Sequence, residues 1–533
     1  MIYLLCPDEH AYAGNLVKSA LARSFSQKQV EKIDFQLFND NFEEKVLSEN
    51  VYVIISPPED WSEFIEKLIS KEKVKILFFG ALSPSLSCNL GVTLAPIPEQ
   101  LHLFAETEST PAYDSRESLL RVRYLQTLGS IVSPIMDRPF VRFDFSNEWN
   151  NLGFGAIRLD GSPWSMQQIV FLRSPRARLL ANVVLGEDAI SVYSACWDFE
   201  NSSLLWFNRI VGPIDSHEWR LIEEFVSSYR FRQIPCLPVL IEVPFGYSGA
   251  VTMRLDCDEE ISSSRFLFKL YKDRGIPFSL AVHTALLEES SHHKFLVELL
   301  NSGGAILSHS ATHPKNWGGS YEEAYFEAKK SKETLLEATG EVIRYAVSPF
   351  HQTPAYALKA LYDAGYSGCI GGIISSDPEF LLARGGEVLD SEIGFIGHSQ
   401  QCMFHGDCLL KGPDPLIIYK KAFEHSFNGK ALFGFLDHPF SERYQYGWKN
   451  EKTRIDIHNL FLNYIAKRRK VIFLNESQAM DFLFVKGKIS ISNTPRGFRF
   501  NTSALKESIT PLVVAAELGG TLYPIYDGME ITC

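Results

Sequence analysis

Residues 306–314, ILSHSATHP, carry two histidines four residues apart at the end of a short apolar run. A helix would place His309 and His313 on one face, but Pro314 and the two glycines before the run disfavour a helix. We therefore expect a buried strand that ends at His309, followed by a loop that brings His313 back toward it. Two imidazoles delivered to one point are candidate ligands of a metal ion.

Strand-like and helix-like segments alternate repeatedly along residues 246–485. The strand-like segments are GAVTMRLD, PFSLAVH, GAILSHS, IRYAVSP, YSGCIGG, EIGFIGHS, ALFGFLDH and KVIFLN. Helix-like stretches separate them, at 265–274, 292–301, 321–339, 355–364, 414–427 and 454–468. Seven or eight such units over these residues predict a TIM-like (β/α)7-8 barrel.

The first half of the chain has a different organisation. Residues 1–125 also alternate, with MIYLLC, KIDFQLF, VYVIIS and KVKILFFG as strands, which predicts an α/β parallel-sheet domain of Rossmann-like or amidotransferase-like type. It contains no GxCxG or GxSxG nucleophile elbow and no GxGxxG after its first strand, so we expect a non-catalytic domain. Residues 126–240 are a strand-rich continuation of this half. Prolines near 235–245 mark a boundary, and residues 486–533 are expected to form a small β appendage.

Composition limits the classes of function. With 533 residues, 45% of them hydrophobic, the chain should fold into roughly three or four globular domains. A net charge of −12 disfavours a nucleic-acid or anionic-membrane binder. Nine cysteines without a CxxC pair disfavour a zinc knuckle, and free thiols without a signal peptide favour the cytoplasm. No apolar run is long enough for a transmembrane segment. The oligomeric state stays open.

Polar side chains gather where the predicted barrel strands end, which is where such barrels carry their active sites. These residues are Asp256, Asp258, His283, His309, His313, His351, His398, His405, Asp407, Asp437 and His438. Two imidazoles and one carboxylate can hold a divalent metal, a second carboxylate can accept a proton from water, and another histidine can protonate a leaving group. Alone, the aspartates could cap a helix and the histidines could bond within loops. The convergence of several strand ends favours a hydrolase site.

Four short motifs that contain or adjoin these residues resemble the signatures of one known family. RLDCDE, HSATH, VSPF and LDH occur in this order at residues 254–259, 309–313, 347–350 and 436–438. They are similar to the TFDDG, H-[ST]-x-x-H, R-x-P-Y and L-x-H signatures of the polysaccharide deacetylases with NodB homology, carbohydrate esterase family 4. The resemblance covers about residues 246–485.

The resemblance implies a role for each matching residue. Asp256 corresponds to the catalytic base and His438 to the catalytic acid, while Asp258, His309 and His313 correspond to the ligands of a divalent metal, zinc being the expected one. We retain His351, His398, His405, Asp407 and Asp437 as candidates for contact with the substrate or with the ligands. The implied reaction removes an N-acetyl or other N-acyl group from a sugar or a nucleotide- or lipid-linked sugar precursor in surface polysaccharide biosynthesis.

Three departures from the family keep alternatives open. RLDCDE spaces its aspartates as in the RIDVD opening of formamido-arabinose lipid deformylases, so Asp256 and Asp258 could exchange roles. Val347 replaces the arginine of the third motif, and Arg254 or Arg344 is a candidate to supply that charge. The fourth family motif is not recognisable, although GHSQQCMFHGD at 397–407 could fill its place. SERYQYGW at 441–448 is either a sugar-stacking or a packing segment.

Two rival functions stay open, and the missing third-motif arginine and the large first half favour the first of them. One is an inactive, deacetylase-fold protein that binds carbohydrate or acts as a scaffold. The other is an amidase that acts on a non-sugar amide.

Overall fold

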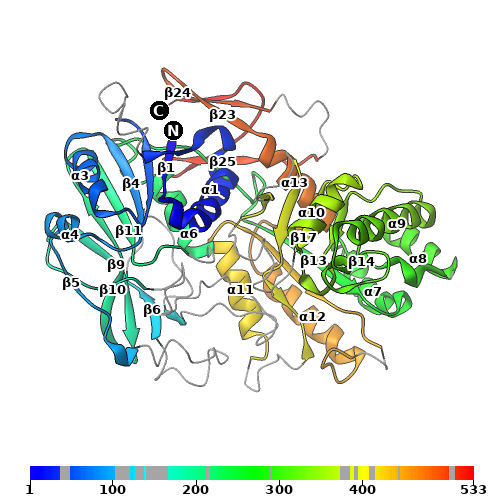
Figure 1. Cartoon of the computed structure of the whole chain (residues 1–533). Helices are drawn as coiled ribbons and strands as arrows, with labels where there is room; N and C mark the ends of the chain where they lie inside the picture. Colours follow the sequence, from blue (N-terminus) through cyan, green and yellow to red (C-terminus); the bar gives the residue numbers. More distant parts are fainter. Residues whose placement is uncertain are drawn as a thin grey trace.

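The structure is a computed structural model that describes residues 1–35, 48–101, 120–125, 137–139, 166–211, 216–288, 290–371, 384–388, 394–406, 414–441, 445–502 and 510–532. It contains one large β-sheet in each half of the chain, with helices packed against both (Figure 1). The mixed α/β class predicted from the sequence is confirmed. None of the described helices is long and apolar enough to cross a membrane.

The sheet of the first half combines parallel and antiparallel strands. Its order is β2-β1-β3-β4-β11-β10-β9-β6-β7, in which neighbours are parallel from β2 to β11 and antiparallel from β11 to β7. The bounds are β1 Ile2–Leu5, β2 Val30–Ile33, β3 Val51–Ile55, β4 Val74–Phe79, β6 Leu120–Tyr124, β7 Asp137–Pro139, β9 Ala177–Leu185, β10 Asp188–Asp198 and β11 Ser202–Phe207. Strands β3 and β4 are buried along their whole length, which explains their unbroken apolar sequences.

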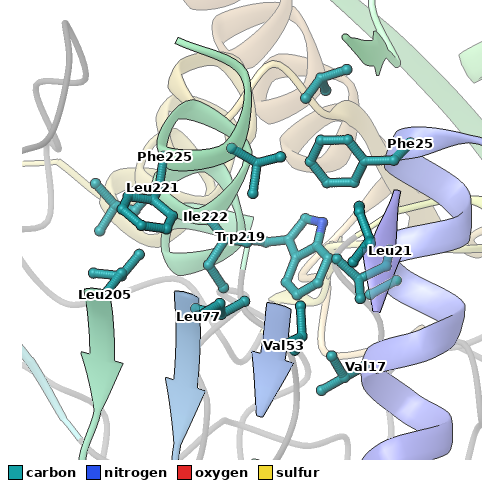
Figure 2. Packing of buried hydrophobic residues seen from close by; sticks show 14 of the residues in the cluster. Val17, Leu21, Phe25, Val53, Leu77, Leu205, Trp219, Leu221, Ile222 and Phe225 are labelled. Atoms are coloured by element: carbon teal, nitrogen blue, oxygen red, sulfur yellow. The ribbon is translucent and has the colours of Figure 1, made fainter. Parts of the chain in front are cut away.

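Helices cover both faces of this sheet because the side chains of each strand alternate between the faces. Helices α1 (Ala11–Phe25) and α6 (Ser216–Ser227) pack on one face, and α3 (Ser62–Lys71) and α4 (Pro84–Leu90) on the other. Trp219 of α6 lies between Leu21 of α1 and the strand residues Val53 and Leu77 (Figure 2). Its indole N–H donates to Ser24 Oγ at 2.9 Å, so this large ring is buried without an unpaired donor.

The sheet of the second half is almost wholly parallel. Its order is β18-β19-β17-β16-β15-β14-β13-β21-β20, and β22 also pairs with β13. Among the pairs formed by the described strands of this sheet, only β18–β19 is antiparallel. The bounds are β13 Gly249–Cys257, β14 Ser279–Val282, β15 Ala305–Ser308, β16 Tyr345–Val347, β17 Gly368–Gly371, β18 Gly386–Glu387, β19 Ile396–Ser399, β20 Cys402–Met403, β21 Leu432–Asp437 and β22 Val471–Leu474. The strands predicted from the sequence are therefore present and parallel.

The predicted barrel is not detected as a closed ring of paired strands among the described residues. Strand β19 lies near one end of the strand order and β20 lies at the other end. The two strands are nevertheless adjacent in the chain, because only Gln400 and Gln401 separate them. Strand β19 pairs with β17, whereas β20 pairs with β21 on the other side of β13. The segment 396–403 thus pairs with strands near both edges of the sheet.

Helices follow most strands of this sheet. They are α7 Arg265–Asp273, α8 Ser290–Asn301, α9 Tyr321–Thr339, α10 Ala355–Asp363, α11 Ile417–Asn428, α12 Glu451–Ala466 and α13 Glu476–Lys488. The long helix α9 begins where Ser320 accepts a hydrogen bond from the Glu323 N–H, and it ends at Gly340, whose φ of 75° suits glycine. The first six helices match the predicted ones to within a few residues, whereas α13 was not predicted.

The strands predicted in residues 486–533 are present but share a core with the first half. They form a hairpin of β23 (Ser490–Thr494) and β24 (Gly497–Asn501) with β27 (Glu530–Thr532), and a pair of β25 (Ala515–Leu518) and β26 (Thr521–Pro524). Strand β25 also pairs with β12 (Val239–Ile241), within the predicted boundary region. Their apolar side chains lie in the same hydrophobic cluster as α1 and α6. The predicted domain limits therefore stay predictions.

Candidate metal centre and active site

The histidine loop after β15 is folded back on itself. His309 continues the strand, since its N–H donates to the Val282 carbonyl at 2.9 Å. Ser310 and His313 then adopt positive φ angles of 67° and 57°, which are uncommon for residues other than glycine. The carboxylate of Glu327 on α9 accepts the N–H groups of Ala311 and Thr312, each at 2.8 Å. Glu327 therefore holds the loop that returns His313 to His309.

Asp258, His309 and His313 form one compact cluster. The Nε2 atoms of the two histidines are 3.1 Å apart, and each lies 3.3 Å from Asp258 Oδ1. The Nδ1 atom of His309 donates to the Val347 carbonyl at 3.0 Å, so in the neutral ring Nε2 directs its lone pair toward the cluster. One carboxylate oxygen and two imidazole nitrogens thus lie within 4.8 Å of one another, close enough to bind the same ion.

The electrostatic state of this cluster suits a cation. Although burial alone would raise the pKa of Asp258, the neighbouring His309, His438 and His313 hold it far below its usual range, so the carboxylate is ionised. Burial lowers the pKa of His313 to about 4, which keeps this imidazole neutral at physiological pH. Asp258 Oδ1 is buried and has no hydrogen-bond donor among the described residues. Asp258 and Asp256 instead raise the pKa of His309 against the effect of its burial. A buried carboxylate oxygen that faces two imidazole nitrogens has the donor set of a divalent metal site.

Asp256 lies two residues earlier on β13 and is paired with an arginine. Its Oδ1 and Oδ2 accept hydrogen bonds from Arg254 Nε and Nη2 at 2.6 and 3.1 Å, and both side chains are buried. Burial would raise the pKa of Asp256, but the Arg254 guanidinium lowers it to about 2. Arg344 instead donates to Asp481 at 2.6 Å. Of the two candidates for the missing arginine charge, Arg254 is therefore the one beside Asp256.

His438 faces the cluster from the end of β21. Its Nε2 lies 3.7 Å from Asp258 Oδ2. The ring stacks on Tyr446 with centroids 3.9 Å apart and planes 10° from parallel, and the Tyr446 hydroxyl donates to Asp258 Oδ2 at 2.6 Å. Tyr446 thus contacts both the carboxylate of the cluster and the imidazole opposite it.

Asp437, which precedes His438, lies beneath the site and is fully buried. Its carboxylate contacts His458 Nε2 at 2.9 Å and Arg454 Nη1 at 3.5 Å. His458 Nδ1 in turn lies 3.0 Å from the Tyr271 hydroxyl. These partners leave Asp437 no exposed surface for a substrate, and they hold the end of β21 that carries His438.

The other predicted residues surround this centre at different depths. His351, which has a φ of 56°, and His398 of β19 are buried, and burial lowers the pKa of each to about 3. His405 follows β20, and its ring meets Tyr446 edge-on with centroids 6.2 Å apart. Asp407 lies outside the described residues. The roles of these four residues stay predictions.

Three residues that contact the cluster or the loop that carries it were missed or ranked low from the sequence. Glu327 is one of several glutamates of α9 and is buried there, which its sequence context does not signal. Tyr446 lies in the segment considered for sugar stacking, but its contacts are with Asp258 and His438. His283 ends β14 and donates from Nε2 to the Asp258 backbone carbonyl at 2.8 Å. Its place at a strand end is the signal that could have ranked it higher.

We expect Tyr446→Phe to weaken zinc binding by about tenfold, because hydrogen bonds that orient metal ligands contribute this much to affinity. The phenylalanine keeps the ring that stacks on His438, so kcat at saturating zinc should change less than the affinity. Tyr446→Leu removes both contacts and should lower kcat as well. Chelator competition measures the affinity; equal zinc affinity of Tyr446→Phe and the wild type would contradict this role of the hydroxyl.

The fold and the site together define an α/β protein with a carboxylate–imidazole cluster at the carboxyl ends of parallel strands. The family model described as polysaccharide deacetylase matches residues 262–369, which include both cluster histidines. The family resemblance inferred from the motifs is therefore confirmed over these residues. No curated protein matches this chain.

The chain is also similar to several solved structures. A putative polysaccharide deacetylase from Mycobacterium smegmatis is 13% identical, with 45% of this chain and 92% of that one covered at a TM-score of 0.36. Agd3, described as a novel carbohydrate deacetylase, is 9% identical, with 100% and 98% covered at 0.43. BA3943 from Bacillus anthracis, described as a pseudoenzyme of carbohydrate esterase family 4, is 13% identical, with 44% and 66% covered at 0.29.

Proposed function

We propose that this protein is a metal-dependent hydrolase that removes an N-acetyl or other N-acyl group from a sugar. The observation that carries the proposal is the cluster of Asp258, His309 and His313 with Asp256 and His438 close by. A scaffold protein would have no need to keep an ionised carboxylate and two imidazoles facing one another, since such a cluster costs stability when no cation is bound.

Asp258, His309 and His313 would hold the metal, for which zinc suits the nitrogen and oxygen donors. When bound, the metal supplies Lewis-acid polarisation of the amide carbonyl and a lower pKa for a bound water. The direct contacts of Asp258 with both histidines support Asp258 as the ligand and Asp256 as the base.

Asp256 would accept the proton of the attacking water. Its pairing with Arg254 keeps the carboxylate ionised and fixes its orientation, so it is ready to accept a proton at physiological pH. Arg254 would also take the place of the arginine that is missing at Val347, because it supplies the same positive charge from the strand that carries Asp256.

His438 would protonate the departing amine. Stacking on Tyr446 fixes the plane of its ring, and Nε2 faces Asp258. The buried partners of Asp437 hold the backbone beneath it. The base and the acid thus approach the cluster from two different strands, β13 and β21.

The finer architecture and setting are proposals as well. Segment 396–403 would close the second sheet into a deacetylase barrel of seven or eight strands. The described cysteines are all free, which supports a reducing compartment such as the cytoplasm. There the substrate would be an N-acylated sugar, nucleotide- or lipid-linked, on its way to a surface polysaccharide.

The test is acetate release by the purified protein from a panel of N-acetylated sugars and non-sugar amides. We expect release from sugars in the zinc-loaded protein and none after chelation, with recovery on adding zinc. Full activity of the chelated protein would contradict the mechanism. Release only from non-sugar amides would favour an amidase, and zinc binding without any release would favour an inactive carbohydrate-binding protein.

A further inference from the structure

A second pocket lies at the opposite end of β13 from the candidate active site. It has a volume of about 410 Å3 and is lined by Ser248, which precedes β13, and by residues of α6, α11 and the β12–β25–β26 sheet. Asp258 follows the other end of this nine-residue strand, so roughly 30 Å separate the two places at ~3.3 Å per residue. The pocket is therefore distinct from the Asp258 cluster.

One wall of the pocket is aromatic and faces solvent. Phe245 and Tyr247 are 40% and 41% exposed, and Phe427 at the end of α11 lines the same pocket. The turn between the two exposed rings is held in place, since Phe245 N–H donates to the Val513 carbonyl at 2.8 Å and Tyr247 N–H to the Pro244 carbonyl at 3.1 Å. Exposed aromatic rings on a fixed turn are preorganised to stack on a ligand.

Other residues of the lining are polar, and its two cations are paired. Arg220 pairs with Glu517 at 2.6 Å and with Glu224 at 3.2 Å, and Lys430 pairs with Glu517. The two cations of the lining, Arg220 and Lys430, are thus already paired with carboxylates, one of which, Glu517, does not line the pocket. Glu224 does line the pocket.

We propose that this pocket binds a neutral saccharide unit of a glycan. A sugar ring presents apolar C–H faces, which stack on aromatic rings, and hydroxyl groups, which hydrogen-bond to carboxylate and amide side chains. Asn428, which lines the pocket and for which the described residues show no side-chain hydrogen bond, offers an amide, and Glu224 lines the pocket as well. An apolar peptide would leave these polar groups without partners, and an anion would have to displace the carboxylates already paired with Arg220 and Lys430.

The choice of a glycan rests on the proposed function, because a sugar deacetylase acts on chains that could reach both places. A polymer held at this pocket would stay near the active site between reactions, which raises its effective concentration there. We therefore expect the pocket to lower KM for long glycans and to leave kcat and the reaction of short fragments unchanged.

The test is isothermal titration of the full chain with an N-acetylglucosamine oligosaccharide and with a glucose oligosaccharide. We expect at least one to bind, and its Kd to rise about tenfold in Phe245→Ala and in Tyr247→Ala, the loss that follows removal of one aromatic contact. Tyr526→Ala is the matched control, since Tyr526 is 57% exposed and does not line the pocket. Its Kd should equal that of the wild type.

Two results would overturn the inference: no binding of either oligosaccharide, or equal Kd values for the wild type and Tyr247→Ala. Titration needs no turnover, so the outcome is independent of the proposed reaction. Binding that depends on Tyr247 in a protein that releases no acetate would refute only the deacetylase function. Acetate release by a protein whose binding ignores Tyr247 would refute only the pocket.

Discussion

His309→Ala is expected to purify without zinc and to lose more than about a hundredfold in acetate release. His309 is almost fully buried, and its Nε2 lies 3.1 Å from His313 Nε2 and 3.3 Å from Asp258 Oδ1. Partners that only orient metal ligands contribute about ten- to a hundredfold to affinity or activity, so loss of a direct ligand should exceed that range. Asp258→Asn keeps the side-chain volume but removes the negative charge, and it should have the same effect. Metal content and initial rates measure both losses.

His293→Ala is the matched control for this experiment. His293 lies on α8 away from the cluster, and its Nε2 donates to the Leu287 carbonyl at 3.0 Å. The control should keep the zinc content and the rate of the wild type. If His309→Ala still binds one zinc per chain with unchanged affinity, the cluster of Asp258, His309 and His313 is not the metal site.

The parts of the site that could be predicted from the sequence are those that follow directly from strand ends. Apolar runs such as AILS and GFLD mark buried parallel strands, and the polar residues after them must lie at the same edge of the sheet. This reasoning brought His309, His313 and Asp258 together, and the structure places them within hydrogen-bonding range of one another. Arg254 was also identified as one of two candidates for the missing charge.

The contacts that could not be predicted depend on tertiary packing. Tyr446 is 188 residues from Asp258 in sequence, and only the folded chain shows its hydroxyl at that carboxylate. Glu327 belongs to a helix whose exposed face is rich in glutamate and lysine, so its sequence context does not distinguish it. Likewise, strand propensity predicts β25 but not its pairing with β12, which joins the end of the chain to the core of the first half.

Arg254→Met is expected to lower the free energy of unfolding by about 3–5 kcal/mol, the range for breaking a buried ion pair from one side. Arg254 and Asp256 are 0% and 1% exposed, and two hydrogen bonds join them. Methionine fills a similar volume, so the main effect is a carboxylate left buried without its counter-charge. Urea unfolding of the zinc-loaded protein measures the loss, and acetate release should fall with it because Asp256 loses its fixed orientation.

The double variant Arg254→Met/Asp256→Asn separates the structural role of this pair from its chemical role. Replacing both charges removes the uncompensated carboxylate, so most of the lost stability should return. Acetate release should not return, because the asparagine amide cannot accept the proton of water as Asp256 would. If the double variant regains both stability and activity, Asp256 is not the base. If Arg254→Met alone is as stable as the wild type, the pair does not stabilise the fold as the buried hydrogen bonds require.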